Sequence, residues 1–451
     1  MIHLGNYFSP LNISNLFLLL VFVVCCEVVG YRLILFSVKE VPTFLRGTVW
    51  LLGLGLIIFF YFLMHLFLPF SSPVFIFILV VLFSLSIRTY IKDKAWEEMF
   101  SFLKINKIPL LIILIILPKV IIKSSLPPYL WDEMAYHYIS PYTLYFEKSW
   151  FIGNSFYQNL PRLLETVYVA LFSISKTYSI ARVIHFMIFI SFLLTAYTYL
   201  KKKFGFWTAI LYFIATLFFS ENFLLWSTLG YVDVGTMSFV MISVISFLDF
   251  YLDNKSGQLF FSVAFMGMAI GSKYSALTQL LSLLIITTGI LFVRKNVSFF
   301  KSRIFISGIV LLFVLGGYWY AKNLVFTGNP IYPFLFGCKF VPCETVSLAY
   351  TNPLNIMNAP VIYATMFLNN KFLEIMLPVS ILLTFLFGNK ESKKLLLFVL
   401  VFVTLEILLV RNISGYQDRY FYDWQTLSIL ILVIPISILS KTEKRINLNS
   451  K

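Results

Sequence analysis

Two adjacent carboxylates, Asp132 and Glu133, are the residues of this chain best suited to chemistry. They follow an apolar run, 108–122, that is long enough to cross most of a bilayer. A charge where a span leaves the membrane is costly unless it is paired, hydrated or used, so an acidic pair there is a candidate functional site. The pair is flanked by ring side chains, which are Trp131, Tyr136 and His137.

Further polar side chains lie between apolar runs farther along the chain. They are Asp233, Lys273, Tyr274, Lys322, Asn329, Tyr332 and Arg419. Cations at a membrane surface suit the phosphate leaving group of a lipid donor. A carboxylate base suits an acceptor hydroxyl that loses its proton as it attacks. Sugar transfer with inversion requires that base on the face opposite the leaving group.

The elements that carry these residues are apolar helices. Of the 451 residues, 60% are hydrophobic and only 12% are charged, against about 25% charged in soluble domains. Lipid must solvate much of this apolar surface, which predicts an all-α polytopic membrane protein. The breaks between apolar runs predict about 13 spans, at 16–36, 48–68, 73–88, 108–122, 181–200, 205–220, 231–252, 258–271, 274–293, 304–320, 371–388, 393–411 and 424–440.

The basic residues predict the topology. A net charge of +15 in a soluble protein would suggest a nucleic-acid partner. Here most Lys and Arg lie in short loops between apolar runs, which is typical of cytoplasmic loops, so we expect no nucleic acid. With the C-terminus in the cytoplasm, alternation places loops 123–180, 321–370 and 412–423 outside. We therefore expect a multi-pass protein of the cell (inner) membrane with its active site on the non-cytoplasmic side.

The segment 161–179 must not cross the membrane in this topology, because crossing would place Lys201, Lys202 and Lys203 outside. Its apolar residues recur at helical spacing, which predicts a helix lying along the outer membrane surface. A short true span is the alternative.

The order of these motifs resembles membrane glycosyltransferases of the GT-C fold. It is most similar to the family-39-like group, which includes protein O-mannosyltransferases and the aminoarabinose transferase of lipid A. The resemblance covers about residues 108–440. Its motifs are Pro127-Pro128 with 131–137, Gly230-Tyr231-Val232-Asp233, Gly271-Ser272-Lys273-Tyr274, Trp319-Tyr320-Ala321-Lys322-Asn323 with 328–333, and Arg419-Tyr420.

The resemblance implies an inverting transferase that uses a polyprenyl-phosphate sugar and a glycan, lipid or protein acceptor. Asp132 would be the general base, and Glu133 would be the second catalytic acid. Lys273, Lys322 and Arg419 would bind the lipid phosphate. The other substrate-binding candidates are Tyr136, His137, Asp233, Tyr274, Asn329 and Tyr332. No cofactor is certain, and a divalent metal stays open, held by Asp132 and Asp233 if one is used.

The resemblance also predicts the domain organisation: additional spans over 1–107, a GT-C-like catalytic domain over 108–440, and a basic cytoplasmic tail over 441–451. Two departures from the family stand out. Three extra spans precede the one that carries the acidic pair. Lys322 stands where relatives often have Arg, and Lys binds phosphate as a point charge without the bidentate fork.

Simpler roles remain open for several of these residues. Asp132 and Glu133 could cap an interfacial helix, and Asp233 could cap the span that follows it. Lys273 could extend to the interface, and Arg419 could pair with a neighbouring acid.

A local disulfide between Cys338 and Cys343 is plausible if their loop faces an oxidising compartment, with free thiols as the alternative. Two other functions also remain. A transporter or flippase of lipid-linked saccharides would carry ionisable groups near mid-bilayer and internal repeats. A polysaccharide polymerase or ligase would be expected to carry several outer-loop arginines.

Overall fold

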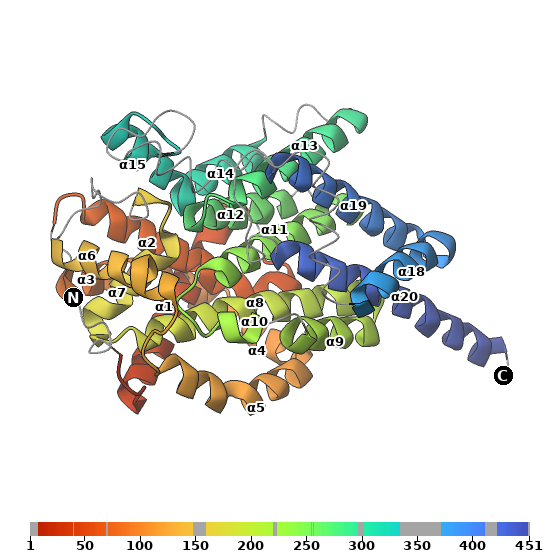
Figure 1. The fold of residues 1–451 in the computed structure, drawn as a ribbon, viewed down its shortest axis with the longest axis horizontal. Helices are drawn as coiled ribbons and strands as arrows, with labels where there is room; N and C mark the ends of the chain where they lie inside the picture. The colour runs from red at the N-terminus through yellow and green to blue at the C-terminus, as the bar shows by residue number, and fades with distance from the viewer. Residues whose placement is uncertain are drawn as a thin grey trace.

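The chain folds into a bundle of helices, which Figure 1 shows in a computed structural model. The structure describes residues 8–38, 40–68, 71–147, 159–219, 223–253, 255, 257–295, 302–333, 371–410 and 422–449. Within these ranges it contains helices and no strand. This is expected, because a helix satisfies its own backbone hydrogen bonds where lipid offers no partner.

The first half of the chain forms ten α-helices and three shorter 3₁₀ or π-helices within the described residues. They are α1 (Ile13–Ser37), the 3₁₀ helix η2 (Thr43–Thr48), α2 (Val49–Met64), α3 (Ser72–Lys92), α4 (Ala95–Ile105), α5 (Lys107–Ser124), the π-helix η3 (Glu133–His137), α6 (Ile139–Glu147), α7 (Leu163–Ser175), α8 (Ser179–Phe204), α9 (Phe206–Ile214), the π-helix η5 (Ala215–Phe219) and α10 (Phe223–Trp226).

The second half continues the bundle with longer helices. They are α11 (Asp233–Asp253), α12 (Gly257–Ser272), α13 (Ala276–Val293), α14 (Arg303–Leu312), the π-helix η7 (Phe313–Gly317), α15 (Tyr318–Thr327), α18 (Lys371–Phe387), α19 (Lys390–Val410) and α20 (Tyr422–Asn449).

Each of the predicted spans coincides with one of these helices or with a continuous series of them. Within the described residues, seven helices are long and apolar enough to cross a membrane. Helices α4 and α5 pass the same test as a pair bent by 80°, which is either a broken span or a re-entrant loop. Five further apolar helices, α7 among them, are shorter. The prediction of an all-α polytopic membrane protein is confirmed.

Helices α8 and α11 form the centre of the bundle. Nearly every residue of both is buried, and α11 packs on α12 while α8 packs on α9 and α11. The outer helix α3 instead exposes large apolar side chains along its length, as a lipid-facing helix does. Figure 1 shows this arrangement, with α8 and α11 in the middle and α5 and α13 at the periphery.

The N-terminal helices pack directly on the rest of the bundle. Helix α2 contacts α7 and η7, and η2 contacts α8. Inside the first span, the buried Glu27 pairs with Arg46 Nη1 at 2.5 Å. Such a pair keeps a charge tolerable in a low-dielectric environment.

Helix α12 crosses η7 closely enough to require glycine. A Cβ added at Gly316 would lie 1.9 Å from the carbonyl oxygen of Gly267. This contact is backbone on backbone, as is common where membrane helices approach closely at small residues.

Helix α7 forms where the sequence predicts a helix outside the spans, but its surroundings differ from the expectation. Its residues from Leu163 to Ser173 are all buried, and it contacts α2, α3, α6, α8 and α12. The helix therefore has no polar face open to solvent. One polar residue of the amphipathic pattern, Glu165, contacts His137 inside the protein.

Candidate active site

Arg182, in the first turn of α8, connects the acidic pair to three other segments. Its Nη2 donates to Glu133 Oε1 at 2.8 Å, and its Nε donates to the Tyr138 hydroxyl at 2.9 Å. Its Nη1 donates to the Leu126 carbonyl oxygen at 2.5 Å. Glu133 Oε1 also accepts from the Gly230 backbone N–H at 2.6 Å. One buried ion pair thus joins the end of α5, η3, α8 and the segment before α11.

The environment of this pair is apolar and aromatic. Both side chains are fully buried, and the guanidinium lies over the rings of Phe8 and Tyr138, 4.7 and 5.6 Å from their centroids. Burial raises the pKa of the Tyr138 phenol above its usual range, although Arg182 opposes this, so the phenol keeps its proton. The pair therefore fixes the position of η3.

Asp132 immediately precedes η3 and is itself only 8% exposed. The five residues that follow form a π-helical turn, a rare conformation that is found mostly at functional sites. Trp131 and Met134 on either side remain exposed. The hydrogen bonds that Glu133 accepts from Arg182 and Gly230 therefore hold Asp132 beside the surface of the bundle.

His137 closes η3 and contacts a second carboxylate. Its Nδ1 lies 2.9 Å from Glu165 Oε1, and both groups are buried. Its ring lies 4.2 Å from that of the half-buried Tyr136 and 5.4 Å from that of Tyr231, between centroids. Tyr231 belongs to the segment that leads into α11, so this contact joins the first acidic motif to the second.

The second motif contains an ion pair between helix ends. The Lys273 ammonium, just after α12, donates to Asp233 Oδ1 in the first turn of α11. Asp233 is nearly buried, while the Lys273 side chain is 22% exposed. A carboxylate in the first turn also gains from the helix dipole. Asp233 and Lys273 come from two different sequence motifs, and the ion pair brings these motifs together.

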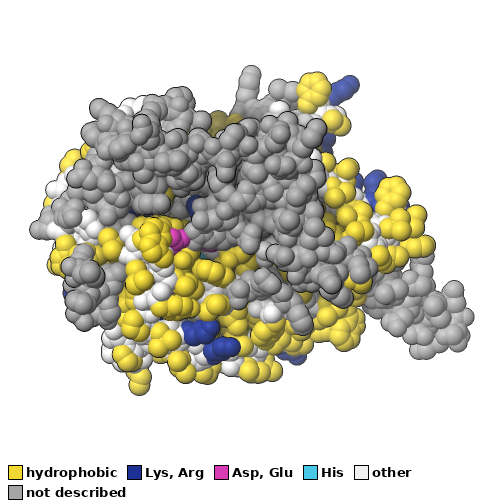
Figure 2. All heavy atoms as spheres, in the orientation of Figure 1, with side chains coloured by type: hydrophobic (Ala, Val, Ile, Leu, Met, Phe, Trp, Pro, Cys, Tyr) yellow, Lys and Arg dark blue, Asp and Glu magenta, His cyan; other side chains and the backbone are white. Residues whose placement is uncertain are grey.

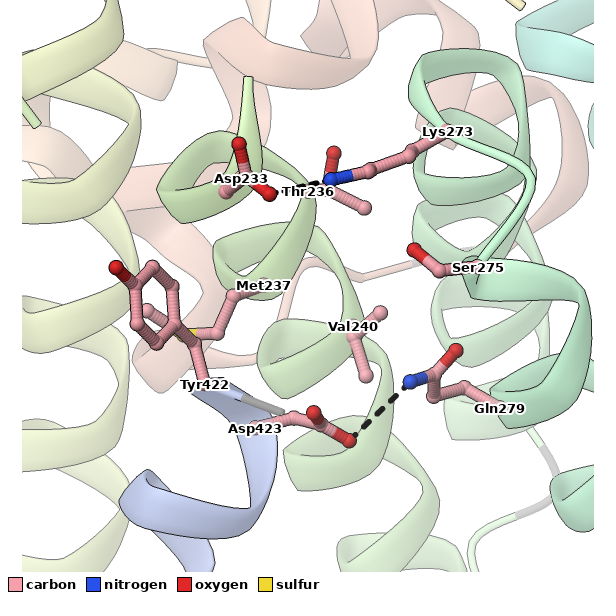
Figure 3. A pocket seen from close by; sticks show the side chains of 9 residues that line it. All are labelled: Asp233, Thr236, Met237, Val240, Lys273, Ser275, Gln279, Tyr422 and Asp423. Atoms are coloured by element: carbon pink, nitrogen blue, oxygen red, sulfur yellow. Dashed lines mark hydrogen bonds and ion pairs between the residues drawn. The ribbon is translucent and has the colours of Figure 1, made fainter. Parts of the chain in front are cut away.

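The Asp233–Lys273 pair forms one end of a small pocket, which Figure 3 shows between α11, α13 and α20. Its volume is about 20 Å³, which is enough for about one water molecule. The side chains that line it are Asp233, Thr236, Met237, Val240, Lys273, Ser275, Gln279, Tyr422 and Asp423. Gln279 Nε2 donates to Asp423 Oδ2 at 3.4 Å at its other end.

A second pair of acids lies behind this end of the pocket. Asp423 interacts with Glu406 of α19, and the Trp424 indole N–H donates to Glu406 Oε2. All three side chains are buried. Glu406 lies inside a predicted span and is held by neighbouring polar groups.

Tyr274 begins a hydrogen-bonded chain to the motif formed by 319–323 and 328–333. Its hydroxyl donates to the Tyr332 carbonyl oxygen at 2.9 Å and accepts from Asn323 Nδ2 at 2.8 Å. Burial raises the pKa of Tyr274 well above its usual value, so the hydroxyl remains a donor. Asn329 shapes the turn here, because its Oδ1 accepts from the Ile331 N–H at 2.9 Å.

Lys322 lies deeper than a loop residue would. It is 5% exposed and lies over the Trp319 ring, 5.5 Å from the centroid. It is close enough to Arg162 for the two charges to repel. Burial lowers the pKa of Arg162 to about 9, partly offset by Glu165, so its guanidinium is still charged at neutral pH. The Arg162 guanidinium thus places positive charge before α7 and beside Lys322 of α15.

Three of the predicted residues, Arg419, Cys338 and Cys343, lie outside the described residues. Among the residues that the structure does describe, no group of three or more His, Cys, Asp or Glu side chains is arranged to hold a metal ion. The two metal candidates, Asp132 and Asp233, each precede or begin a different helix.

Two residues of this cluster, Arg182 and His185, were not among the predicted site residues. Arg182 and His185 lie within a predicted span, where the apolar pattern gives no indication of their partners. His185 lies 3.0 Å from the Leu229 carbonyl oxygen and accepts from the Gly235 N–H at 2.8 Å. His185 thus holds the 229–235 segment, which carries Asp233, against α8, and Arg182 does so only through Glu133. A charged or titratable side chain just inside a span is the only signal that could have identified them.

Comparison with known proteins gives a structural likeness only. No family model matches the chain, and no curated protein matches it by sequence. The structure is similar to the crystal structure of ArnT from Cupriavidus metallidurans bound to undecaprenyl phosphate, with a TM-score of 0.52 and 13% identity. The match covers 74% of this chain and 60% of that one.

The chain therefore has a GT-C-like fold. The apo form of the same ArnT gives a TM-score of 0.46 over 68% of this chain and 55% of that one, at 13% identity. The chain spans about 60% of the length of the ArnT chain that it matches. The likeness is one of fold, a polytopic membrane architecture.

Proposed function

We propose that the chain is an inverting glycosyltransferase that moves a sugar from a polyprenyl-phosphate donor to an acceptor on the non-cytoplasmic face of the membrane. Two observations support this. A similar structure was crystallised with undecaprenyl phosphate. The main support is geometric. Hydrogen bonds to Glu133 fix the turn that follows Asp132. The same turn contacts, through His137 and Tyr231, the segment that carries the Asp233–Lys273 pair.

In the proposed reaction, Asp132 acts as the general base. An acceptor hydroxyl attacks the anomeric carbon and transfers its proton to the Asp132 carboxylate. A new C–O bond forms as the bond between this carbon and the phosphate oxygen breaks. The electron pair leaves with the polyprenyl phosphate, and the sugar inverts because attack comes from the opposite face.

Glu133 acts as a positioning residue in this proposal. Its Oε1 is already used by Arg182 and Gly230. Releasing it to react would leave a buried guanidinium without its charge partner, at a cost of about 3–5 kcal/mol. Its contribution is therefore to hold η3, and with it Asp132, in place.

In this proposal, basic side chains bind the phosphate of the lipid donor. Lys273 is the partly exposed member of its ion pair, and it lines the pocket. Because the pocket holds only about one water molecule, it must widen for a donor to bind. Arg162 is a second cation of the site, and Lys322 and Arg419 are further candidates for binding the phosphate. Developing charge on the leaving phosphate is stabilised by such preorganised cations.

Transfer from a purified labelled donor tests the proposal. The protein, reconstituted with polyprenyl-phosphate sugar, should transfer the sugar or slowly hydrolyse the donor. Asp132→Asn should lower this rate by about 10²–10⁴-fold. The matched control is Asp93→Asn, an exposed acid after α3, which should retain full rate. Full turnover in Asp132→Asn contradicts the role of Asp132 as the general base. Movement of the intact donor across vesicle membranes without sugar transfer contradicts the glycosyltransferase activity.

A further inference from the structure

A second hollow lies outside the candidate active site, between α5 on one side and η5 with α10 on the other. Its volume is about 330 Å³, within the range of small-molecule sites. The residues that line it are Lys119, Val120, Lys123, Leu217, Phe218, Leu224, Leu225 and Thr228. None of them lines the Asp233–Lys273 pocket. We call this hollow the α5 groove.

One wall of the α5 groove is basic. Lys119 and Lys123 are four residues apart on α5, so they lie one helical turn apart on the same face. Like charges at this spacing destabilise a helix unless an anion compensates them. Among the described residues, neither ammonium has an ion-pair or hydrogen-bond partner. The pair is thus available to a ligand.

The opposite wall is apolar. Phe218 of η5 is half exposed, and Leu224 and Leu225 of α10 are partly buried. The one polar side chain there, Thr228, donates its hydroxyl to the Leu225 carbonyl oxygen at 2.8 Å and is buried. Figure 2 shows basic side chains set among hydrophobic ones on the face of the molecule over α5. The groove therefore offers two cations beside a hydrocarbon surface.

We propose that the α5 groove binds a lipid phosphate monoester, with its phosphate between Lys119 and Lys123 and its hydrocarbon along Phe218, Leu224 and Leu225. The two positive charges of the groove favour a phosphate monoester over a phosphate diester. A phosphate monoester carries about −1.5 to −2 at pH 7 and neutralises both ammonium groups, whereas a diester carries one charge. The site does not depend on the proposed transfer reaction, because it shares no lining residue with that pocket.

Native mass spectrometry of the full-length protein in detergent tests this site with matched lipids. Phosphatidic acid supplies a monoester, phosphatidylglycerol supplies a diester, and diacylglycerol with the same chains supplies no phosphate. Phosphatidic acid should bind saturably and more tightly than either of the others. The Lys119→Ala/Lys123→Ala double variant should weaken it by about five- to tenfold. Inorganic phosphate should compete only weakly, because it lacks the hydrocarbon.

Two further variants separate a binding defect from a folding defect. Lys119→Arg/Lys123→Arg keeps both charges and should retain affinity for phosphatidic acid. Lys107→Ala removes an exposed lysine from the other end of α5 and should change nothing. Unchanged affinity in the double alanine variant overturns the proposal. So does equal binding of phosphatidic acid and diacylglycerol, or of phosphatidic acid and phosphatidylglycerol.

Discussion

Replacing Glu133 with Gln separates a positioning role from a catalytic one. Gln keeps the size of the side chain and an oxygen that can accept from Arg182 Nη2 and the Gly230 N–H. It removes the negative charge that both donors now approach. We expect the η3 turn to loosen, so that stability and turnover fall together.

The magnitude follows from the two hydrogen bonds to Oε1. A bond to a charged group contributes about 1.5–3 kcal/mol, and a neutral one contributes about 0.5–1.5 kcal/mol. Losing the charge weakens the bond from the neutral Gly230 N–H by about 1–1.5 kcal/mol. Arg182 keeps an acceptor but loses its charge partner, so the total for Glu133→Gln should approach the lower end of the cost of a broken buried pair, about 3 kcal/mol. For a large protein this lowers the melting temperature by about 3–6 °C. Glu133→Leu also removes both hydrogen bonds and should cost about 5 kcal/mol.

The assay combines thermal unfolding in detergent with donor turnover, measured on the same preparations. A double-mutant cycle with Arg182→Gln isolates the pair, and the coupling should lie near the upper part of the range of about 0.5–3 kcal/mol. Glu98→Gln is the matched control. Glu98 is half exposed and 3.4 Å from Arg46 Nε, so its loss should cost no more than about 1 kcal/mol.

One result would refute this reasoning. If Glu133→Gln abolished turnover while melting stayed as in the unmodified protein, the carboxylate would be acting on substrate. A coupling energy near zero would equally remove Arg182 as its anchor.

Three other substitutions have defined outcomes. Lys273→Ala should raise the KM for the lipid-phosphate donor by about tenfold or more with a smaller change in melting, since it removes a charge-assisted phosphate contact; an unchanged KM would exclude the lysine from donor binding. Gly316→Ala should destabilise the protein by about 1–3 kcal/mol through overpacking, whereas Gly289→Ala, where an added Cβ meets nothing within 4 Å, should be neutral or slightly stabilising; equal melting of both variants would contradict the close approach. Tyr274→Phe should lower turnover without shifting its pH profile, because the phenol does not titrate near neutral pH; a lost alkaline limb would mean that it does.

The fold was readable from sequence because lipid imposes simple rules. Apolar runs separated by short basic loops predict where the membrane helices lie, and each predicted run is helical. The number of crossings, about 13, stays a prediction, because seven of the described helices have the length and composition of a span. The buried α7 shows where this reading fails. Its spacing was amphipathic, yet the polar residue Glu165 points to His137 inside the protein and not to water. Residue pattern distinguishes polar from apolar faces, but it does not say what covers a polar face.

The candidate site was readable only in part. Asp132 and Asp233 stood out because carboxylates at span ends are rare and costly. Their supports did not, because Arg182 is 49 residues from Glu133 along the chain and the two meet only through packing. Lys322 shows the opposite case: its loop-like motif suggested exposure, but α15 continues through it and buries it. Pairing between distant residues is a property of the folded chain.

The Arg182 junction has a consequence for tracing distant relatives. The one guanidinium donates to three acceptors between Leu126 and Tyr138, and two of them are side chains that a substitution would remove. Homologues too divergent for alignment should therefore be sought by a sparse pattern. It consists of a glutamate following the loop aspartate and an arginine four residues into the helix that enters the membrane about fifty positions later.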